Sequence, residues 1–330
     1  MKISNSTARV CVGLALGLLL VSAQPVFAWG DVGHRIVARI AARHLTKDAR
    51  ERLVAILRAA FVDDLQLRTI IGNPNAPQPP VSALEEAMTR MATWPDHMPG
   101  GKGNTSRWHF VDIGLFETPA QIDARCGPTC VSERIEKIRA SLESGQTLEV
   151  TQPDGHKLVF RADRQLRFLI HFMGDIHQPL HAVSNADAGG NCVTATNYEF
   201  ADNLHSVWDT QLVMTTIAGL SDPAGAIITQ FKAEQASAEG ETNAKAIAGE
   251  SFELAKTRIY PNITPKPAPV IPTFIDVSPR ECSTEAPAEI RALVVKGPGT
   301  FRDATSLRIV RRQLFRAGVR LAAILNELLK

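Results

Sequence analysis

The sequence predicts a mainly α-helical fold with only minor β-hairpin elements, and three observations lead to this prediction. Apolar residues recur at helical spacing through most of the chain. Stretches with the alternating pattern of strands are few and short. Hydrophobic residues make up 45% of the 330 positions, which is enough for one large core. We therefore expect a single helical domain over residues 29–330.

The first 28 residues have the pattern of a secretory signal peptide. Lys2 and Arg9 are followed by an apolar run from Cys11 to Val21. The sequence Val26-Phe27-Ala28 then places small residues at the third and the first positions before a cleavage site. The apolar run is too short to span ~30 Å of hydrocarbon. We expect cleavage after Ala28 and a secreted or periplasmic mature protein. No lipoprotein cysteine follows the cut, so no membrane anchor is expected.

Helical periodicity is found in eight segments, which are separated by turn-forming sequences. The predicted helices cover residues 31–46, 48–60, 82–92, 131–144, 161–177, 206–219, 243–258 and 303–329. A hairpin is expected around Pro153-Asp154-Gly155, and a second extended stretch is expected at 192–199. Eight prolines between residues 261 and 300 predict a long surface excursion ahead of the last helix.

The last predicted helix combines apolar residues at three-to-four spacing with five arginines, which are Arg308, Arg311, Arg312, Arg316 and Arg320. A basic amphipathic helix of this kind can bind a membrane surface. A packed terminal helix with a solvated basic face is the simpler interpretation. We favour the packed helix and expect no membrane partner, because charges elsewhere in the chain balance the arginines.

The charge balance argues against a broad surface for nucleic acid. The chain has 36 basic and 34 acidic residues, and removal of the leader takes away two basic residues and no acidic one. The mature chain is therefore formally neutral, which excludes tight binding to many duplex phosphates through a basic face. Any recognition of phosphate must be local.

Four cysteines remain after removal of the leader, and an oxidising compartment would pair them in one of three ways. The Cys126-Gly-Pro-Thr-Cys130 loop holds two turn formers that would let its ends meet, which leaves Cys192 for Cys282. We favour this pairing. A zinc site built from cysteines is the alternative, but the sequence has no second closely spaced pair to complete it.

The densest group of residues with ligand chemistry lies between positions 171 and 209. His171 precedes Asp175 by four residues, and His205 precedes Asp209 by four, so each pair projects from one helix face. A proline two residues before His181 should end the first helix and turn His181 back toward the same pocket. One such pair is usually a surface ion pair, but two pairs beside a third histidine indicate a metal site.

Weaker signals of the same chemistry come from two stretches and from the mature N-terminus. Asp96 follows a turn former, and His109 lies among apolar neighbours, where a lone histidine is more often a core residue. After cleavage, Trp29 would offer a free α-amine and its own carbonyl oxygen as a chelate. His34 lies little more than one helical turn away.

Together these residues resemble the S1/P1 nuclease family, a family of secreted zinc nucleases related to zinc-dependent phospholipase C. The family's ligand pattern is present in order and in spacing at Trp29, His34, Asp96, His109, His171, Asp175, His181, His205 and Asp209. The resemblance covers most of the mature chain and implies a mainly helical phospholipase C/nuclease-type fold with three Zn²⁺ ions. It implies that the ions divide these ligands into three sets: Asp96, His109, His171 and Asp175 for one; Trp29, His34 and the bridging Asp175 for the second; and His181, His205 and Asp209 for the third.

The charges of such a cluster indicate its chemistry. Three Zn²⁺ ions outweigh three aspartates, so the pocket would attract a phosphodiester anion. A hydroxide shared by the close zinc pair would be the nucleophile and the third zinc would stabilise the departing 3′ oxygen, so no side-chain general base is required. The catalytic group would then be Asp96, His109, His171 and Asp175. The resemblance implies single-stranded DNA and RNA as substrates, 5′-phosphorylated products, and 3′-mononucleotides as second substrates.

The resemblance also implies substrate contacts. Phe110 would stack an unpaired base and Asp112 would hydrogen-bond its edge, although the residues alone equally fit a core aromatic and a turn acceptor. Asn191, which follows two glycines, would contact phosphate. Two features depart from the pattern. Pro99 stands where several members carry a basic residue, and His177 is an extra imidazole that we expect to be structural or to support the ligands.

Two other functions remain open. A zinc-dependent phospholipase C shares the ligand scheme, but only four residues separate Trp29 from His34, and the last carboxylate is Asp209 rather than a glutamate. A zinc-binding protein without turnover is the second alternative. The sequence indicates no obligate protein partner, and it does not rank DNA against RNA.

Overall fold

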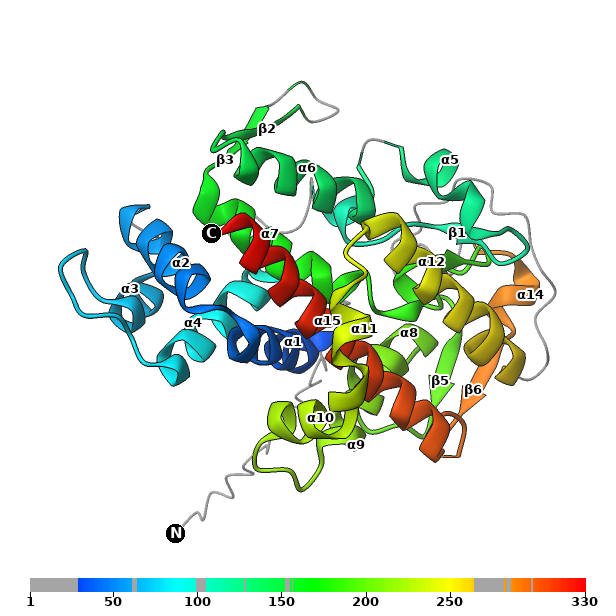
Figure 1. Ribbon diagram of the computed structural model, residues 1–330. Helices are drawn as coiled ribbons and strands as arrows, with labels where there is room; N and C mark the ends of the chain where they lie inside the picture. Colours follow the sequence, from blue (N-terminus) through cyan, green and yellow to red (C-terminus); the bar gives the residue numbers. More distant parts are fainter. Residues whose placement is uncertain are drawn as a thin grey trace, which may run out of the picture.

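Helices from opposite ends of the chain meet at the centre of the fold. In this computed structural model, α1 (Gly30–His44) packs against α15 (Ala304–Leu328), and both also contact α7 (Ala162–Asp175) (Figure 1). Helix α4 (Val81–Thr93) lies beside α1 and α7. The buried apolar faces of these helices form one core. The fold is therefore mainly helical, as predicted.

The structure describes residues 29–60, 64–98, 105–127, 129–151, 155, 157–263, 282, 286–297 and 299–330. The predicted leader 1–28, Pro99, and the turn residues Pro153 and Asp154 lie outside the described residues.

The predicted helices are confirmed to within a few residues, and capping explains several of their starts. Thr46 Oγ1 accepts a hydrogen bond from the Ala49 amide at the start of α2, and Asp303 caps α15 in the same way. Two of the predicted helices continue through π-helical turns, η5 (Val207–Gln211) and η7 (Ala255–Ile259). The other α-helices of the described ranges are α2 (Lys47–Ala59), α3 (Leu65–Ile71), α5 (Ile122–Cys126), α6 (Val131–Glu143), α8 (Leu204–Ser206), α9 (Leu212–Ile217), α10 (Pro223–Phe231), α11 (Gln235–Glu239), α12 (Ala244–Leu254) and α14 (Ala288–Arg291).

Strands are short and paired two by two within the described residues. The predicted hairpin is confirmed as β2 (Leu148–Thr151) antiparallel to β3 (Lys157–Phe160). The extended stretch at 192–199 contains β5 (Thr194–Thr196), which pairs in parallel with β6 (Val294–Lys296). A third pair, β1 (Ile113–Gly114) with β4 (Val183–Ser184), joins two segments that carry predicted site residues.

The prediction of a surface excursion over 261–300 is wrong for the part from 286 onward. Helix α14 and β6 belong to this part, and Ile290, Leu293 and Val295 are buried in the core. The prediction relied on the many prolines of this segment, which are typical of loops. The short apolar run around Leu293 nevertheless buries enough surface to fold back against β5.

Both favoured disulfides are confirmed, Cys126 to Cys130 and Cys192 to Cys282. Helix α15 is packed, as predicted, but its arginines are not all on a solvated face. Arg320 is buried, and its guanidinium donates to both carboxylate oxygens of Glu250. Within the described part of the chain, no helix combines the length and the apolar character needed to cross a membrane.

The close packing of α1 against α15 depends on a glycine, Gly318, at their contact. A Cβ on Gly318 would collide with the side chain of Ile40 and lie 3.1 Å from the Val37 carbonyl oxygen. We expect Gly318→Ala to lower the free energy of unfolding by ~1–2 kcal/mol, because overpacking outweighs the ~1 kcal/mol gain in helix propensity. Gly240→Ala is the control, because its Cβ would meet no atom nearer than 3.6 Å in a right-handed backbone. Urea unfolding that shows equal stability for both variants would contradict this account.

Candidate metal centre

The last turn of α7 carries the first cluster of predicted ligands. His171 and Asp175 lie one turn apart and are fully buried, with His171 Nε2 3.2 Å from Asp175 Oδ2. Asp96 comes from the 3-10 helix η1 (Trp94–His97), which continues α4, and its Oδ1 lies 3.4 Å from His171 Nε2. Because α4 packs against α7, the segment that follows α4 places the Asp96 carboxylate next to His171.

Two more imidazoles complete the first cluster. His109 ends the 3-10 helix η2 (Ser106–His109), and its Nδ1 lies 2.9 Å from Asp175 Oδ2. His34 of α1 stacks on His171 with ring centroids 4.0 Å apart, and its Nε2 lies 3.3 Å from Asp175 Oδ1. Helix α1 comes this close because Gly174 has no side chain; a Cβ there would lie 2.6 Å from His34 Nδ1.

The second cluster is formed by residues that follow α7. His181 ends the 3-10 helix η4 (Pro179–His181), and its Nε2 lies 3.1 Å from the Nε2 of His205. His205 Nε2 also lies 3.0 Å from Asp209 Oδ2. The predicted turn after α7 therefore brings His181 to its partners. His205 and Asp209 do not lie on one regular α-helix, because Asp209 belongs to the π-helical turn η5.

Three of the imidazoles are oriented by backbone carbonyl groups. The accepting oxygens are those of Ala92 for His171 Nδ1, His109 for His181 Nδ1 and Gly189 for His205 Nδ1, at 2.7, 2.7 and 2.8 Å. When Nδ1–H donates, Nε2 keeps its lone pair, which is the arrangement usual for histidines that bind metals. All three Nε2 atoms face the other predicted ligands.

Buried atoms without hydrogen-bond partners show that a cation fits this donor set. Both ring nitrogens of His34 and Asp175 Oδ1 are buried and have no hydrogen-bond partner in the structure. Leaving such groups unsatisfied costs free energy, and a divalent ion would satisfy the carboxylate oxygen and one of the two ring nitrogens. Three groups of nitrogen and oxygen atoms are close enough to hold ions: His34, Asp96 and His171; His109, His171 and Asp175; and His181, His205 and Asp209.

The electrostatics of the first cluster favour positive charge. Burial opposes protonation of His171, but the charges of Asp175 and Asp96 outweigh it and raise its pKa to about 10. Burial likewise opposes ionisation of Asp175, yet His171 and His109 hold its pKa well below the usual range. In the second cluster, burial and the neighbouring His205 lower the pKa of His181 to about 4. The His181 imidazole is therefore neutral at physiological pH.

Trp29 is buried at the start of α1, where its backbone is left-handed with φ 34°. Helix α1 begins beside the second cluster, since a Cβ on Gly30 would lie 2.9 Å from Thr210 Oγ1 and 3.5 Å from the Asp209 carbonyl oxygen. The N-terminal end of the described chain therefore lies next to a predicted ligand, and His34 lies in the first cluster.

His177 is engaged by groups outside both clusters, as expected for a structural histidine. Its Nδ1 donates to the Met173 carbonyl oxygen at 2.7 Å, and its Nε2 accepts from Arg320 at 3.1 Å. Burial and the nearby Arg320 charge hold the pKa of His177 well below its ordinary value. The neutral imidazole thus joins α7 to α15.

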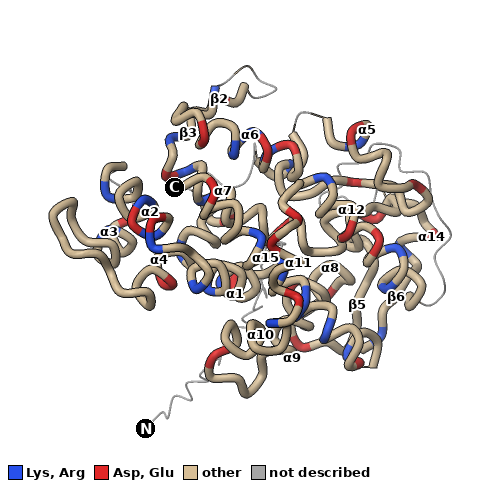
Figure 2. The backbone as a smooth tube through the Cα atoms, in the orientation of Figure 1, with Lys and Arg blue, Asp and Glu red and all other residues tan. Residues whose placement is uncertain are grey.

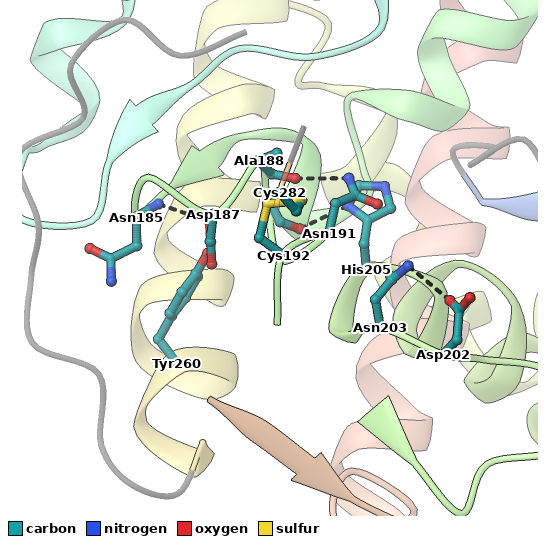
Figure 3. Close-up of a disulfide and its surroundings, with 11 residues drawn as sticks. Asn185, Asp187, Ala188, Asn191, Cys192, Asp202, Asn203, His205, Tyr260 and Cys282 are labelled. Atoms are coloured by element: carbon teal, nitrogen blue, oxygen red, sulfur yellow. Dashed lines mark hydrogen bonds between the residues drawn. A yellow bond between two sulfur atoms is a disulfide. The ribbon is translucent and has the colours of Figure 1, made fainter. Parts of the chain in front are cut away.

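The predicted substrate residues lie beside the clusters. Phe110 and Asp112 follow His109, and burial alternates along this segment. Val111 and Ile113 are buried, whereas Phe110 and Asp112 are half-buried. Asn191 lies beside His205 (Figure 3), and its Nδ2 donates to the Ala188 carbonyl oxygen at 2.8 Å. This bond uses one of the two N–H donors of the amide.

Sequence reasoning missed residues that hold the ligands. Gln178 donates from Nε2 to Asp209 Oδ1 and accepts from the Leu180 amide, and it stands inside the ligand-rich run. Arg134 stacks over Trp108 at 4.2 Å and Arg167 over Trp94 at 4.8 Å, so two cation–π pairs support the turns that carry His109 and Asp96. The position of Gln178 between two predicted ligands could have indicated its role. The cation–π pairs join segments far apart in the sequence, so no sequence pattern indicates them.

Comparisons with known proteins agree with this geometry. The sequence model of the S1/P1 nuclease family matches residues 29–273. Endonuclease 3 of Arabidopsis thaliana is 27% identical over 305 residues, which cover 91% of this chain and 88% of that protein. Nuclease S1 of Aspergillus oryzae is 28% identical over 209 residues, or 61% of this chain and 60% of its own length.

Nuclease P1 of Penicillium citrinum is 27% identical over 208 residues, which cover 59% of this chain and 62% of the relative. The alignments thus span about three fifths of each of the two fungal nucleases. The family match covers well over half of this chain and includes all nine predicted ligands. The chain belongs to the S1/P1 nuclease family.

Proposed function

We propose that this chain, cut after Ala28, is a secreted or periplasmic hydrolase that cleaves single-stranded DNA and RNA with three bound zinc ions. Its products would be 5′-phosphorylated, and 3′-mononucleotides would be second substrates. Residues 29–330 would form the catalytic domain, and the family match also begins at Trp29. The observation that supports this proposal best is the convergence of buried imidazole nitrogens and carboxylate oxygens in two adjoining clusters.

The residues of the first cluster would hold the close pair of ions. Asp175 is suited to bridge them, because Oδ1 faces His34 and Oδ2 faces His109 and His171. Zinc bound there would supply Lewis acidity and activate a water for attack on phosphorus. The carboxylates and imidazoles would orient the ions, and the proposed third set, His181, His205 and Asp209, would face the departing 3′ oxygen.

Local recognition of phosphate agrees with the distribution of charge. Basic and acidic positions are interspersed along the described chain (Figure 2). The proposed binding energy would then come from the ions and from contacts to an unpaired base. Phe110 and Asp112 flank Val111, whose amide donates to the His181 carbonyl oxygen at 2.8 Å. This bond joins their segment to the second cluster and supports the proposal that both side chains contact a nucleotide bound there.

We expect the purified mature protein to contain zinc and to cleave single-stranded DNA and RNA but not lecithin. Chelation should abolish cleavage and lower the melting temperature by about 5–10 °C, because ion binding stabilises only the folded chain. Metal analysis, substrate assays and calorimetry measure these effects. Lecithin hydrolysis would instead identify a phospholipase C.

A matched pair of variants controls for folding. His109→Gln should reduce zinc content and cleavage together, because His109 lies between Asp175 and His171. His44→Gln is the same substitution at an imidazole outside the clusters, which hydrogen-bonds the Ile40 carbonyl oxygen of its own helix. It should change neither zinc content nor cleavage. Zinc content without turnover on any substrate would favour the non-catalytic alternative. Cleavage that persists after verified removal of the metal would exclude the proposed mechanism.

The free amine of Trp29 exists only after cleavage. An uncleavable extension on Trp29 converts this amine to an amide, which is a poor zinc donor. We expect the extended protein to bind two zinc ions rather than three and to cleave at a rate lower by on the order of 100-fold. Protein that begins at Trp29 is the control. Equal metal content and equal rates would show that Trp29 is not a ligand.

Asp112→Asn tests the proposed base contact. Loss of a charged hydrogen bond should lower kcat/KM on single-stranded substrates by about 10-fold or more, or change base preference, while zinc content stays unchanged. Asp123→Asn is the control, because Asp123 is an exposed carboxylate paired with Lys245. Loss of zinc from Asp112→Asn would assign Asp112 to the metal ligands instead.

A further inference from the structure

The loop before Cys192 has an unusual backbone. Ala186 and Ala188 have φ values of 58° and 52°, and Gly189 and Gly190 have 60° and 85°. Left-handed backbone is unfavourable for alanine, because Cβ crowds the following carbonyl oxygen. Two alanines in this conformation within three residues require contacts from elsewhere that hold the loop.

The conformation of the loop matters because of where it places one carbonyl group. Gly189 lies against the Leu180 backbone, and a Cβ there would collide with the Leu180 carbonyl oxygen. In this position the Gly189 oxygen accepts the Nδ1–H of His205 at 2.8 Å. His205 Nε2 then faces His181 and Asp209, at 3.1 and 3.0 Å.

A fully buried carboxylate at the centre of the loop is the main contact that holds it. Asp187 accepts the Asn185 amide at Oδ1, 3.0 Å away, and the phenol of Tyr260 at Oδ2, 2.8 Å away. Figure 3 shows Tyr260 pointing at Asp187 from the end of the neighbouring helical segment. The Asp187 carbonyl oxygen accepts from the Cys192 amide, and the Cys192–Cys282 disulfide fixes that end of the loop.

Tyr260 donates a side-chain hydrogen bond to this carboxylate from a distant segment. It begins the 3-10 helix η8 (Tyr260–Asn262), 73 residues after Asp187. A buried carboxylate that loses a donor is destabilised. Without this hydrogen bond, fewer contacts offset the unfavourable left-handed backbone of the two alanines. The loop can then relax, which would move the Gly189 carbonyl oxygen.

We propose that Asp187 and Tyr260 are positioning residues for the third metal ion. They hold loop 185–192 so that the Gly189 carbonyl fixes the tautomer and direction of the His205 ring. The inference rests on the proposed metal centre. The inference predicts an effect on the third ion alone, because the close pair of ions would be bound by other imidazoles. A tyrosine that only stabilised the fold would affect all three ions alike or none.

The chain offers a matched test, because it has only two tyrosines. Tyr260→Phe removes the bond to Asp187, and Tyr198→Phe removes an equally short bond of 2.8 Å to the Thr300 carbonyl oxygen. In Tyr260→Phe we expect one zinc of three to be lost to a competing chelator at a 10–100-fold lower chelator concentration, the size usual for partners of metal ligands. The other two ions should be retained as in the wild type. Tyr198→Phe should retain all three.

A second readout needs no metal. In metal-free Tyr260→Phe, ¹⁵N NMR of the His205 ring should show a loss of the Nδ1–H tautomer that Tyr198→Phe does not show. Should Tyr260→Phe not fold, Asp187→Asn replaces one acceptor oxygen by a donor and should give the same selective loss. Retention of all three ions with wild-type affinity, or equal loss in both tyrosine variants, would overturn the inference. A wild-type protein that binds two zincs with an intact close pair would overturn it as well, whereas one that binds none would overturn the metal centre itself.

Discussion

A carboxylate removed from water is stable only when positive charge or hydrogen-bond donors surround it, and Asp175 is such a carboxylate. It is fully buried at the end of α7, and imidazoles of His34, His109 and His171 approach its two oxygens from different segments. Helices α1 and α7 meet at this carboxylate, and α4 continues into η1, whose Asp96 lies 3.4 Å from His171 Nε2. Without a cation, buried atoms of this group lack partners. The proposed metal centre would therefore be part of the folding core rather than an addition to it.

The backbone is adapted to the same requirement at several points. Gly174 allows His34 to approach α7, and Gly189 allows its loop to lie on the Leu180 carbonyl group. The π-helical turn η5 places Asp209 opposite His205 and Gln178. Such turns inside helices are often found at functional sites. Several departures from ideal geometry thus lie around the predicted ligands, where fixed positions are needed.

The sequence revealed the parts of the site that are local, and it missed those that depend on the tertiary fold. The four-residue spacing in His171 and Asp175 is visible in one helical turn, so the pair could be predicted. Asp96 and His109 gained weight only from the family pattern, because the packing of η1 and η2 on α7 leaves no local signal. The role of Arg320 was misread for the same reason, since Glu250 and His177 are 70 and 143 residues away.

Segments with mixed signals were the hardest to predict. Prolines outweighed a short apolar run in the segment before α15, yet Ile290 and Leu293 reach the core. Helices α3, α10 and α11 were not predicted, because they are short and their apolar periodicity spans few turns. In these places burial against long-range partners decides the structure, and a single sequence does not show those partners.

The two ligand clusters are linked by covalent chain and by hydrogen bonds. The His109 imidazole lies in the first cluster, while its carbonyl oxygen orients His181 of the second. Gln178, three residues after Asp175, bonds Asp209. A displacement of η2 or of the turn after α7 would therefore disturb both clusters at once. In the proposed site, a phosphodiester held between ions would have to meet all of them in one geometry, and this shared support would keep the two clusters in register.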